Sequence, residues 1–132
     1  MVAFRIDSLD HLVLTVADPE ATCAFYRDVL GLEVVTFGGG RKALRFGTQK
    51  LNLHSPEVDI LPRAKAPAPG AIDLCLLTAT PLEEVIRHLT ACGVDIELGP
   101  VDRTGATGPI RSVYVRDPDG NLVEIANRSV SG

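Results

Sequence analysis

Four polar residues interrupt apolar, strand-like runs of the sequence, and their types indicate a particular chemistry. They are His11, Asn52, Asp73 and Glu124. A carboxylate inside an apolar strand is costly unless it is paired, protonated or bound to a metal. One imidazole and two carboxylates that converge form a suitable site for a divalent cation. These residues therefore predict a metal or ligand site, provided that the fold brings them together.

An internal repeat is the feature that positions them. Asp18 and Thr80 are both suited to cap a helix, each is followed by proline, and each lies 62 residues from the other. Gly31 and Gly93 are suited to end the two helices and have the same offset. Thr80 also forms a capping box with Glu83. The shared register predicts two copies of one unit.

Each predicted helix follows one strand-like run and precedes three shorter ones. The runs are 9–16, 32–37, 42–46 and 50–54 in the first copy, and 72–77, 94–98, 110–116 and 121–126 in the second. This order predicts an α+β fold, in which two tandem βαβββ modules form a curved mixed sheet with a concave cleft. We expect one domain over residues 1–132, with module one at about 6–54, a linker at 55–70 and module two at about 71–127.

The repeat also predicts which residues face one another. His11 and Asp73 are equivalent at the 62-residue offset, whereas Asn52 and Glu124 differ by 72. The roughly ten extra residues of the second copy are assigned to a polar loop, Gly99–Pro109. Because strand residues alternate between faces, all four polar side chains and His54 are predicted to lie on the concave side.

Simpler interpretations remain open at this stage. A single histidine in a strand is usually structural. Glu124 alone fits a charge on an edge strand, and Asp73 alone fits a hydrogen bond to a neighbouring turn.

Composition limits the classes of partner. Thirteen basic and 17 acidic residues give a net charge of −4, so no nucleic-acid partner is expected. No apolar run reaches the ~18 residues of a membrane span, and the first residues do not form a signal peptide. We therefore expect a cytoplasmic protein with no membrane partner. Cys23, Cys75 and Cys92 form no CxxC pair and are predicted to be small buried thiols.

Three longer stretches carry a family resemblance. The runs 9–16, 25–32 and 116–124 resemble the vicinal oxygen chelate superfamily, which includes glyoxalase I, extradiol dioxygenases and bleomycin resistance proteins. The segments 41–44, 50–54, 73–76, 99–101 and 103–106 further resemble the glyoxalase domain-containing protein 5 group. The resemblance covers nearly the whole chain.

The resemblance implies a metal-dependent enzyme, a lyase or isomerase similar to lactoylglutathione lyase or else a thiol transferase. In such proteins a divalent ion is chelated by neighbouring oxygens of the substrate. The implied metal set is His11, Asp73 and Glu124, with Asn52 where glyoxalase I has a carboxylate. An amide accepts no proton, so the implied catalytic groups are His54 and Glu124. The donors suit Mn, Ni, Fe, Mg or Zn.

The resemblance also implies partners and alternatives. We expect a homodimer and a small-molecule substrate, one candidate being a glutathione conjugate held by basic residues among Arg41, Lys42, Arg103 and Arg111. The alternative function is a non-catalytic cleft that binds an antibiotic or toxin, with Asp73 paired to Arg111 or Arg116 in place of a metal. Ring-opening oxygenation of catechols is disfavoured because such enzymes usually have two histidine ligands and longer chains.

Overall fold

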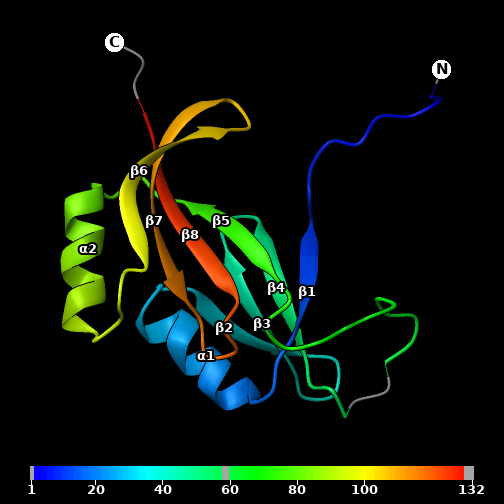
Figure 1. The fold of residues 1–132 in the computed structure, drawn as a ribbon. Helices are drawn as coiled ribbons and strands as arrows, with labels where there is room; N and C mark the ends of the chain where they lie inside the picture. Colours follow the sequence, from blue (N-terminus) through cyan, green and yellow to red (C-terminus); the bar gives the residue numbers. More distant parts are fainter. Residues whose placement is uncertain (1, 58–59, 130–132) are drawn as a thin grey trace. The chain divides into compact units, whose positions relative to one another are not determined.

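The computed structural model describes residues 2–57 and 60–129. The chain divides into two compact units, Met1–Pro62 and Arg63–Gly132, called the first and second unit below. Among the described residues, each unit has one helix and four strands, coloured along the chain in Figure 1.

The first unit contains a four-stranded mixed sheet. Its elements in chain order are β1 (His11–Thr15), α1 (Pro19–Asp28), β2 (Glu33–Phe37), β3 (Arg41–Phe46) and β4 (Gln49–His54). The strands are arranged in the order β1-β4-β3-β2. The β1–β4 pair is parallel, the other two pairs are antiparallel, and α1 packs on β2 and β3.

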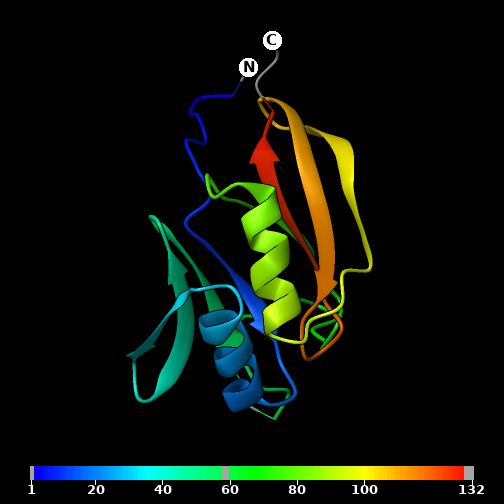
Figure 2. The same cartoon turned by 90° about the vertical axis from the view of Figure 1, so that its left-hand side faces the viewer.

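The second unit repeats this arrangement. Its elements are β5 (Asp73–Leu77), α2 (Leu82–Ala91), β6 (Leu98–Gly105), β7 (Gly108–Arg116) and β8 (Leu122–Arg128), and its sheet order is β5-β8-β7-β6. Helix α2 lies over the sheet and contacts β7 (Figure 2). β5 begins 62 residues after β1, as the repeat predicts. The α+β class and the two βαβββ modules are therefore confirmed.

Alternation of side chains builds the core of each unit. In the first unit, Leu14 and Val16 are fully buried, as their face of the first strand predicts. In the second unit, Val123 and Ile125 are buried in the same way on β8. These apolar faces leave the opposite faces of the two sheets for polar residues.

The prediction of a loop at Gly99–Pro109 is wrong. β6 runs through Leu98–Gly105 and pairs with β7, so the extra residues of the second copy lengthen a β-hairpin. The strand predicted at 94–98 is correspondingly misplaced, since only Leu98 of that run belongs to a strand. β6 is mostly solvent-exposed, and pairing with β7 rather than burial holds it in place. Apolar alternation gives no signal for such a strand.

The two helices begin differently. The Oδ1 atom of Asp18 accepts hydrogen bonds from the backbone N–H groups of Glu20 (3.0 Å) and Ala21 (3.4 Å), so the predicted cap of α1 is confirmed. The predicted Thr80 cap of α2 is wrong, because Pro81 occupies the cap position and the helix has no side-chain cap from its own N-terminus.

Asn127 on β8 takes over the role of the missing cap. Its Oδ1 accepts from the backbone N–H of Leu82 at 2.9 Å, and its Nδ2 donates to the carbonyls of Thr78 and Thr80 at 2.8 Å. One amide therefore ties the start of α2 to the sheet. A residue 45 positions further along the chain supplies this contact, which a local capping pattern does not reveal.

Replacing Asn127 by alanine is expected to lower the free energy of unfolding by about 1–2 kcal/mol, because it removes a helix cap and two further hydrogen bonds. Asn127→Asp keeps an acceptor for Leu82 but loses both donors, and we expect a smaller loss. Urea unfolding followed by circular dichroism measures both values. An alanine variant as stable as the parent protein would contradict this role.

The cysteine prediction holds only in part. Cys23 is buried, whereas Cys75 and Cys92 are exposed, and all three thiols are free. Cys75 is exposed because it lies on the polar face of β5, which alternation assigns opposite to Leu74 and Leu76. Cys92 directly follows α2 and belongs to the turn that ends the helix.

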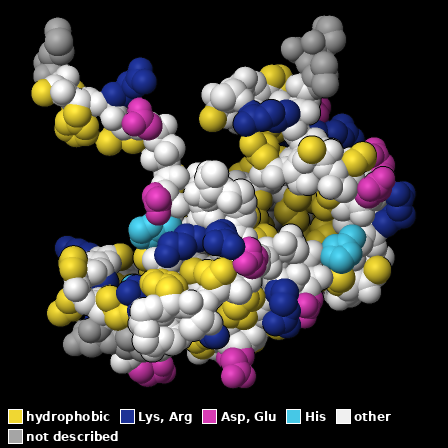
Figure 3. All heavy atoms as spheres, turned by 180° about the vertical axis from the view of Figure 1, so that it is seen from behind, with side chains coloured by type: hydrophobic (Ala, Val, Ile, Leu, Met, Phe, Trp, Pro, Cys, Tyr) yellow, Lys and Arg dark blue, Asp and Glu magenta, His cyan; other side chains and the backbone are white. Residues whose placement is uncertain are grey.

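The surface carries charges of both signs. On the face drawn in Figure 3, lysine and arginine side chains are scattered among acidic ones and form no continuous basic stripe. None of the helices in the described part of the chain has the length and hydropathy needed to cross a membrane.

Candidate functional site

The polar face of the second sheet holds two of the predicted site residues. Glu124 on β8 is paired with Cys75 on β5 and with Tyr114 on β7. Asp73 lies two residues before Cys75 and so shares its face. The structure therefore places Asp73 and Glu124 on one face of neighbouring strands, as the alternation predicts.

Glu124 is held by neighbours on both sides. The hydroxyl of Ser112, a completely buried residue, donates a hydrogen bond to its Oε2 at 2.5 Å. Burial of the thiol, and next the negative charge of Glu124, raise the pKa of Cys75 to about 11, although the residue as a whole is exposed. At neutral pH, Cys75 is thus a protonated thiol that hydrogen-bonds Glu124. The carboxylate has a fixed orientation on the sheet.

A pocket of about 360 Å³ opens beside Glu124. Residues of β5, β8 and the β6–β7 hairpin line it, among them Cys75, Arg103, Ile110, Glu124 and Arg128. The lining combines a carboxylate, two guanidinium groups and apolar side chains. Small-molecule sites usually have this combination of a few polar groups on an apolar wall.

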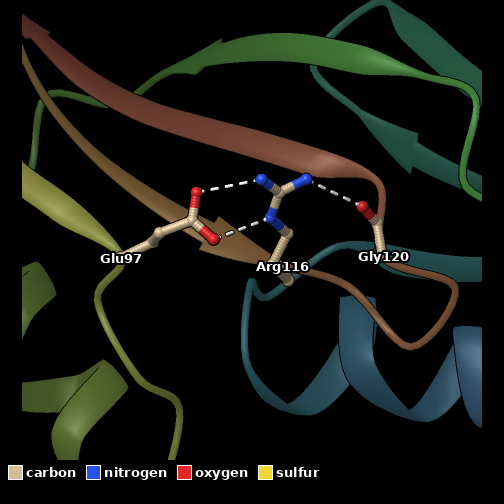
Figure 4. Close-up of polar contacts among 3 residues, drawn as sticks. All are labelled: Glu97, Arg116 and Gly120. Atoms are coloured by element: carbon tan, nitrogen blue, oxygen red, sulfur yellow. Dashed lines mark hydrogen bonds and ion pairs between the residues drawn. The ribbon is translucent and has the colours of Figure 1, made fainter.

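The alternative partners of Asp73 are engaged elsewhere. Arg116 forms a two-point ion pair with Glu97, with both N–O distances at 2.9 Å, and donates to the carbonyl of Gly120 at 3.1 Å (Figure 4). Arg111 lies 3.6 Å from Asp102. Asp73 forms no ion pair within residues 2–57 and 60–129. The carboxylate is therefore not neutralised by either arginine.

In the first unit, His11 is oriented by its neighbour in the chain. Its Nδ1 lies 2.8 Å from Oδ1 of Asp10, and its side chain is 43% exposed. A carboxylate at one ring nitrogen fixes the histidine tautomer and leaves Nε2 as the electron-pair donor. This is the usual arrangement behind a metal-binding histidine.

Asn52 and His54 lie on the same face of β4. Asn52 is buried, and its Oδ1 has no hydrogen-bond partner in the described part of the chain. An orphaned amide oxygen is costly and suits a cation or a ligand donor. Nε2 of His54 lies 3.3 Å from a guanidinium nitrogen of Arg41. Burial, and then the charge of Arg41, lower the pKa of His54, so its imidazole is neutral at neutral pH.

The predicted metal set draws on both units. His11 and Asn52 belong to the first, and Asp73 and Glu124 to the second. Among residues 2–57 and 60–129, no three histidine, cysteine or acidic side chains form a metal-binding group. Each unit by itself offers donor types that suit a divalent cation: an imidazole and an unpaired amide oxygen in the first, and two carboxylates in the second.

Two residues beside Glu124 were missed by the sequence reasoning. Ser112 lies in the predicted strand 110–116, whereas Arg128 lies beyond the predicted strand 121–126, and neither is among the predicted site residues. Alternation along the run 110–116 provides a signal for Ser112, since it places this residue on the same face as Tyr114. Arg103 is among the basic residues predicted to hold a glutathione conjugate, and the structure places it at the pocket.

Comparison with known proteins agrees with this fold. The model of the Glyoxalase/Bleomycin resistance protein/Dioxygenase superfamily matches residues 8–125. The chain belongs to this superfamily.

Individual relatives are similar over most of the chain. Virulence protein STM3117 of Salmonella typhimurium is 54% identical over 121 residues, covering 92% of this chain and 84% of the relative. Its crystal structure has a TM-score of 0.94 and covers 96% of this chain and 100% of that one. Glyoxalase domain-containing protein RDO1 of Mycosarcoma maydis is 49% identical, with 92% and 69% coverage. Lactoylglutathione lyase from Agrobacterium tumefaciens is 29% identical with a TM-score of 0.72, and covers 93% of this chain and 95% of that one.

Proposed function

We propose that this protein is a metal-dependent, glyoxalase-like enzyme that binds a small substrate through neighbouring oxygens. The reaction class is that of a lyase, isomerase or thiol transferase. The observation that carries the proposal is the fixed orientation of two donors. Asp10 holds one nitrogen of His11, and Ser112 holds one oxygen of Glu124. Residues that fix a ligand in this way are typical of metal sites. The similarity to a lactoylglutathione lyase adds support.

The proposed metal donors are His11, Asp73 and Glu124, and Asn52 adds its amide oxygen. The metal would be Mn, Ni, Fe, Mg or Zn, and when bound it stabilises negative charge that develops on a substrate oxygen. His54 is the proposed proton acceptor, because its lowered pKa keeps the imidazole neutral at neutral pH. Glu124 is the second proposed catalytic residue, and the hydrogen bond from Ser112 holds its carboxylate in one orientation toward the substrate.

Further proposals come from the resemblance stated in the sequence analysis. We propose that the protein is a homodimer and that it belongs with the glyoxalase domain-containing protein 5 group. A glutathione conjugate is one candidate substrate.

A second function is favoured by a specific observation. The pocket beside Glu124 combines apolar side chains with a few charged ones, and the resemblance places Asn52 where glyoxalase I has a carboxylate. A non-catalytic protein that binds an antibiotic or toxin in the pocket beside Glu124 needs neither a metal ion nor a carboxylate at position 52. The metal content of the protein separates the two functions.

The test is metal analysis of protein purified without chelator, followed by thermal unfolding with added Mn²⁺, Ni²⁺ or Zn²⁺. An ion that binds only the native state at 100 times its Kd stabilises by about 2.7 kcal/mol. We expect bound metal or a clear rise in Tm with at least one ion. An empty protein whose Tm responds to none of them favours the binding protein.

Turnover of the methylglyoxal–glutathione hemithioacetal with the stabilising ion then tests the lyase reaction. A metal-loaded protein that leaves this compound unchanged excludes it as the substrate while leaving the metal site in place.

A further inference from the structure

The two modules differ most in one hairpin, and that hairpin builds the pocket beside Glu124. β2 and β3 have five and six residues, whereas β6 and β7 have eight and nine. The extension contributes Arg103 and Ile110 to the pocket wall. The extra length of the second module therefore forms part of the pocket wall.

Arg103 is held in place at this wall. Its Nε donates to the Tyr114 hydroxyl at 3.0 Å, its Nη1 donates to the Asp102 carbonyl at 3.1 Å, and its guanidinium lies 5.6 Å from the centre of the Tyr114 ring. Arg128 donates to the hydroxyl of Thr107 in the same hairpin. An arginine restrained by its neighbours loses less conformational freedom when it binds an anion.

The charge of these arginines is not neutralised by a carboxylate. Arg111 and Arg116 have acidic partners, but neither Arg103 nor Arg128 has an ion pair in residues 2–57 and 60–129. Two guanidinium groups and the carboxylate of Glu124 leave the pocket lining with one net positive charge. An anion with a single charge balances it. A planar guanidinium matches a carboxylate in both geometry and charge.

We propose that this pocket binds a small organic carboxylate, with the carboxylate group at Arg103 and Arg128 and the rest of the molecule directed toward Glu124. The volume of about 360 Å³ lies near the lower end for ligand pockets, so the ligand is small. The apolar wall, with Leu77 and Ile110, contacts its carbon skeleton. Binding of the carboxylate is inferred from the pocket alone. The further step, that this carboxylate is the substrate, rests on the proposed function.

Isothermal titration of metal-free protein tests the inference with mandelate, which has a carboxylate, a neighbouring hydroxyl and an apolar ring. Its neutral amide, mandelamide, is the matched ligand control, and phenylphosphonate tests a different anion. We expect mandelate to bind at least tenfold more tightly than either. Arg103→Gln and Arg128→Gln should each weaken mandelate binding tenfold or more. Arg87→Gln, which removes an exposed charge from α2 in the same unit, should have no effect.

Three results would overturn the inference: equal binding of mandelate and mandelamide, unchanged binding in both pocket variants, or the same loss in Arg87→Gln. Tighter binding of phenylphosphonate would assign the pocket to phosphonates and refute the carboxylate. Both pocket arginines are exposed, so the variants are expected to fold, and thermal unfolding verifies this. Mandelate binding without any metal response would reject the proposed enzyme alone. A metal response without carboxylate selectivity would reject this inference alone.

Discussion

Glu124→Ala is expected to lower the affinity for Mn²⁺ or Ni²⁺ by about 100-fold or more. Loss of a residue that only orients a metal ligand typically costs 10–100-fold in affinity, and loss of a ligand costs at least as much. Ser112→Ala removes the 2.5 Å hydrogen bond to Glu124 and keeps the carboxylate, so we expect about a 10–100-fold loss. Competition with a metal-sensitive dye measures both affinities.

The order of the two effects is the informative result. If Ser112 orients Glu124, the serine variant lies between the parent protein and Glu124→Ala. Glu84→Ala is the matched control, because Glu84 is an exposed acid on α2 in the same unit, and it should retain the parent affinity. His11→Ala should match Glu124→Ala. Parent-like affinity in Glu124→Ala, with the fold retained by circular dichroism, would remove Glu124 from the metal site.

Local patterns predicted much of the fold. The apolar alternation around His11 and Asp73 identified β1 and β5, and the 62-residue offset placed them at equivalent positions. The Asp18 cap was also predicted, because Asp18 and the N–H groups it binds are neighbours in the chain. Interactions between residues close in sequence are visible in the sequence itself.

Contacts between distant segments were not predicted. β6 is a polar strand held by pairing with β7, so neither burial nor apolar alternation indicates it. The start of α2 is bound by Asn127, which no pattern near Thr80 reveals.

In the candidate site, too, local patterns were predicted and contacts between distant segments were not. Alternation placed Asp73 and Glu124 on one face, but the contact of Ser112 with Glu124 depends on the pairing register of β7 and β8. Register between strands is set by the whole sheet and its turns, and one strand alone does not specify it.

The turn between β7 and β8 sets that register and gives the second large prediction. The Oδ1 atom of Asp117 accepts from the backbone N–H groups of Asp119 (3.0 Å) and Asn121 (2.9 Å), and its Oδ2 accepts from Nδ2 of Asn121 (2.8 Å). Asn121 is fully buried, and its Oδ1 accepts from the backbone N–H of Ile72 at 2.9 Å. The network therefore joins the turn to the residue before β5.

Asp117→Ala is expected to lower the free energy of unfolding by about 3 kcal/mol, because it leaves buried donors without an acceptor and each such group costs about 1–3 kcal/mol. Urea unfolding measures the loss. Asp95→Ala, at an exposed position of the same unit, should stay within about 0.5 kcal/mol of the parent protein. An Asp117→Ala variant that is equally stable would show that the turn does not depend on this carboxylate.

Asp117→Asn tests whether the network requires a side chain at position 117 that only accepts hydrogen bonds. The amide keeps one oxygen for the backbone donors, but its NH₂ group then faces Nδ2 of Asn121, so two donors meet. Turning the Asn121 amide over relieves that contact and places its NH₂ group against the N–H of Ile72 instead. One donor–donor contact remains in either arrangement. We therefore expect the stability of Asp117→Asn to lie between those of the parent protein and Asp117→Ala. Parent-like stability would show that the network does not require an acceptor-only side chain at position 117. Because β5 and β8 carry Asp73 and Glu124, the same variants should also weaken metal binding in proportion to the disturbance of this turn.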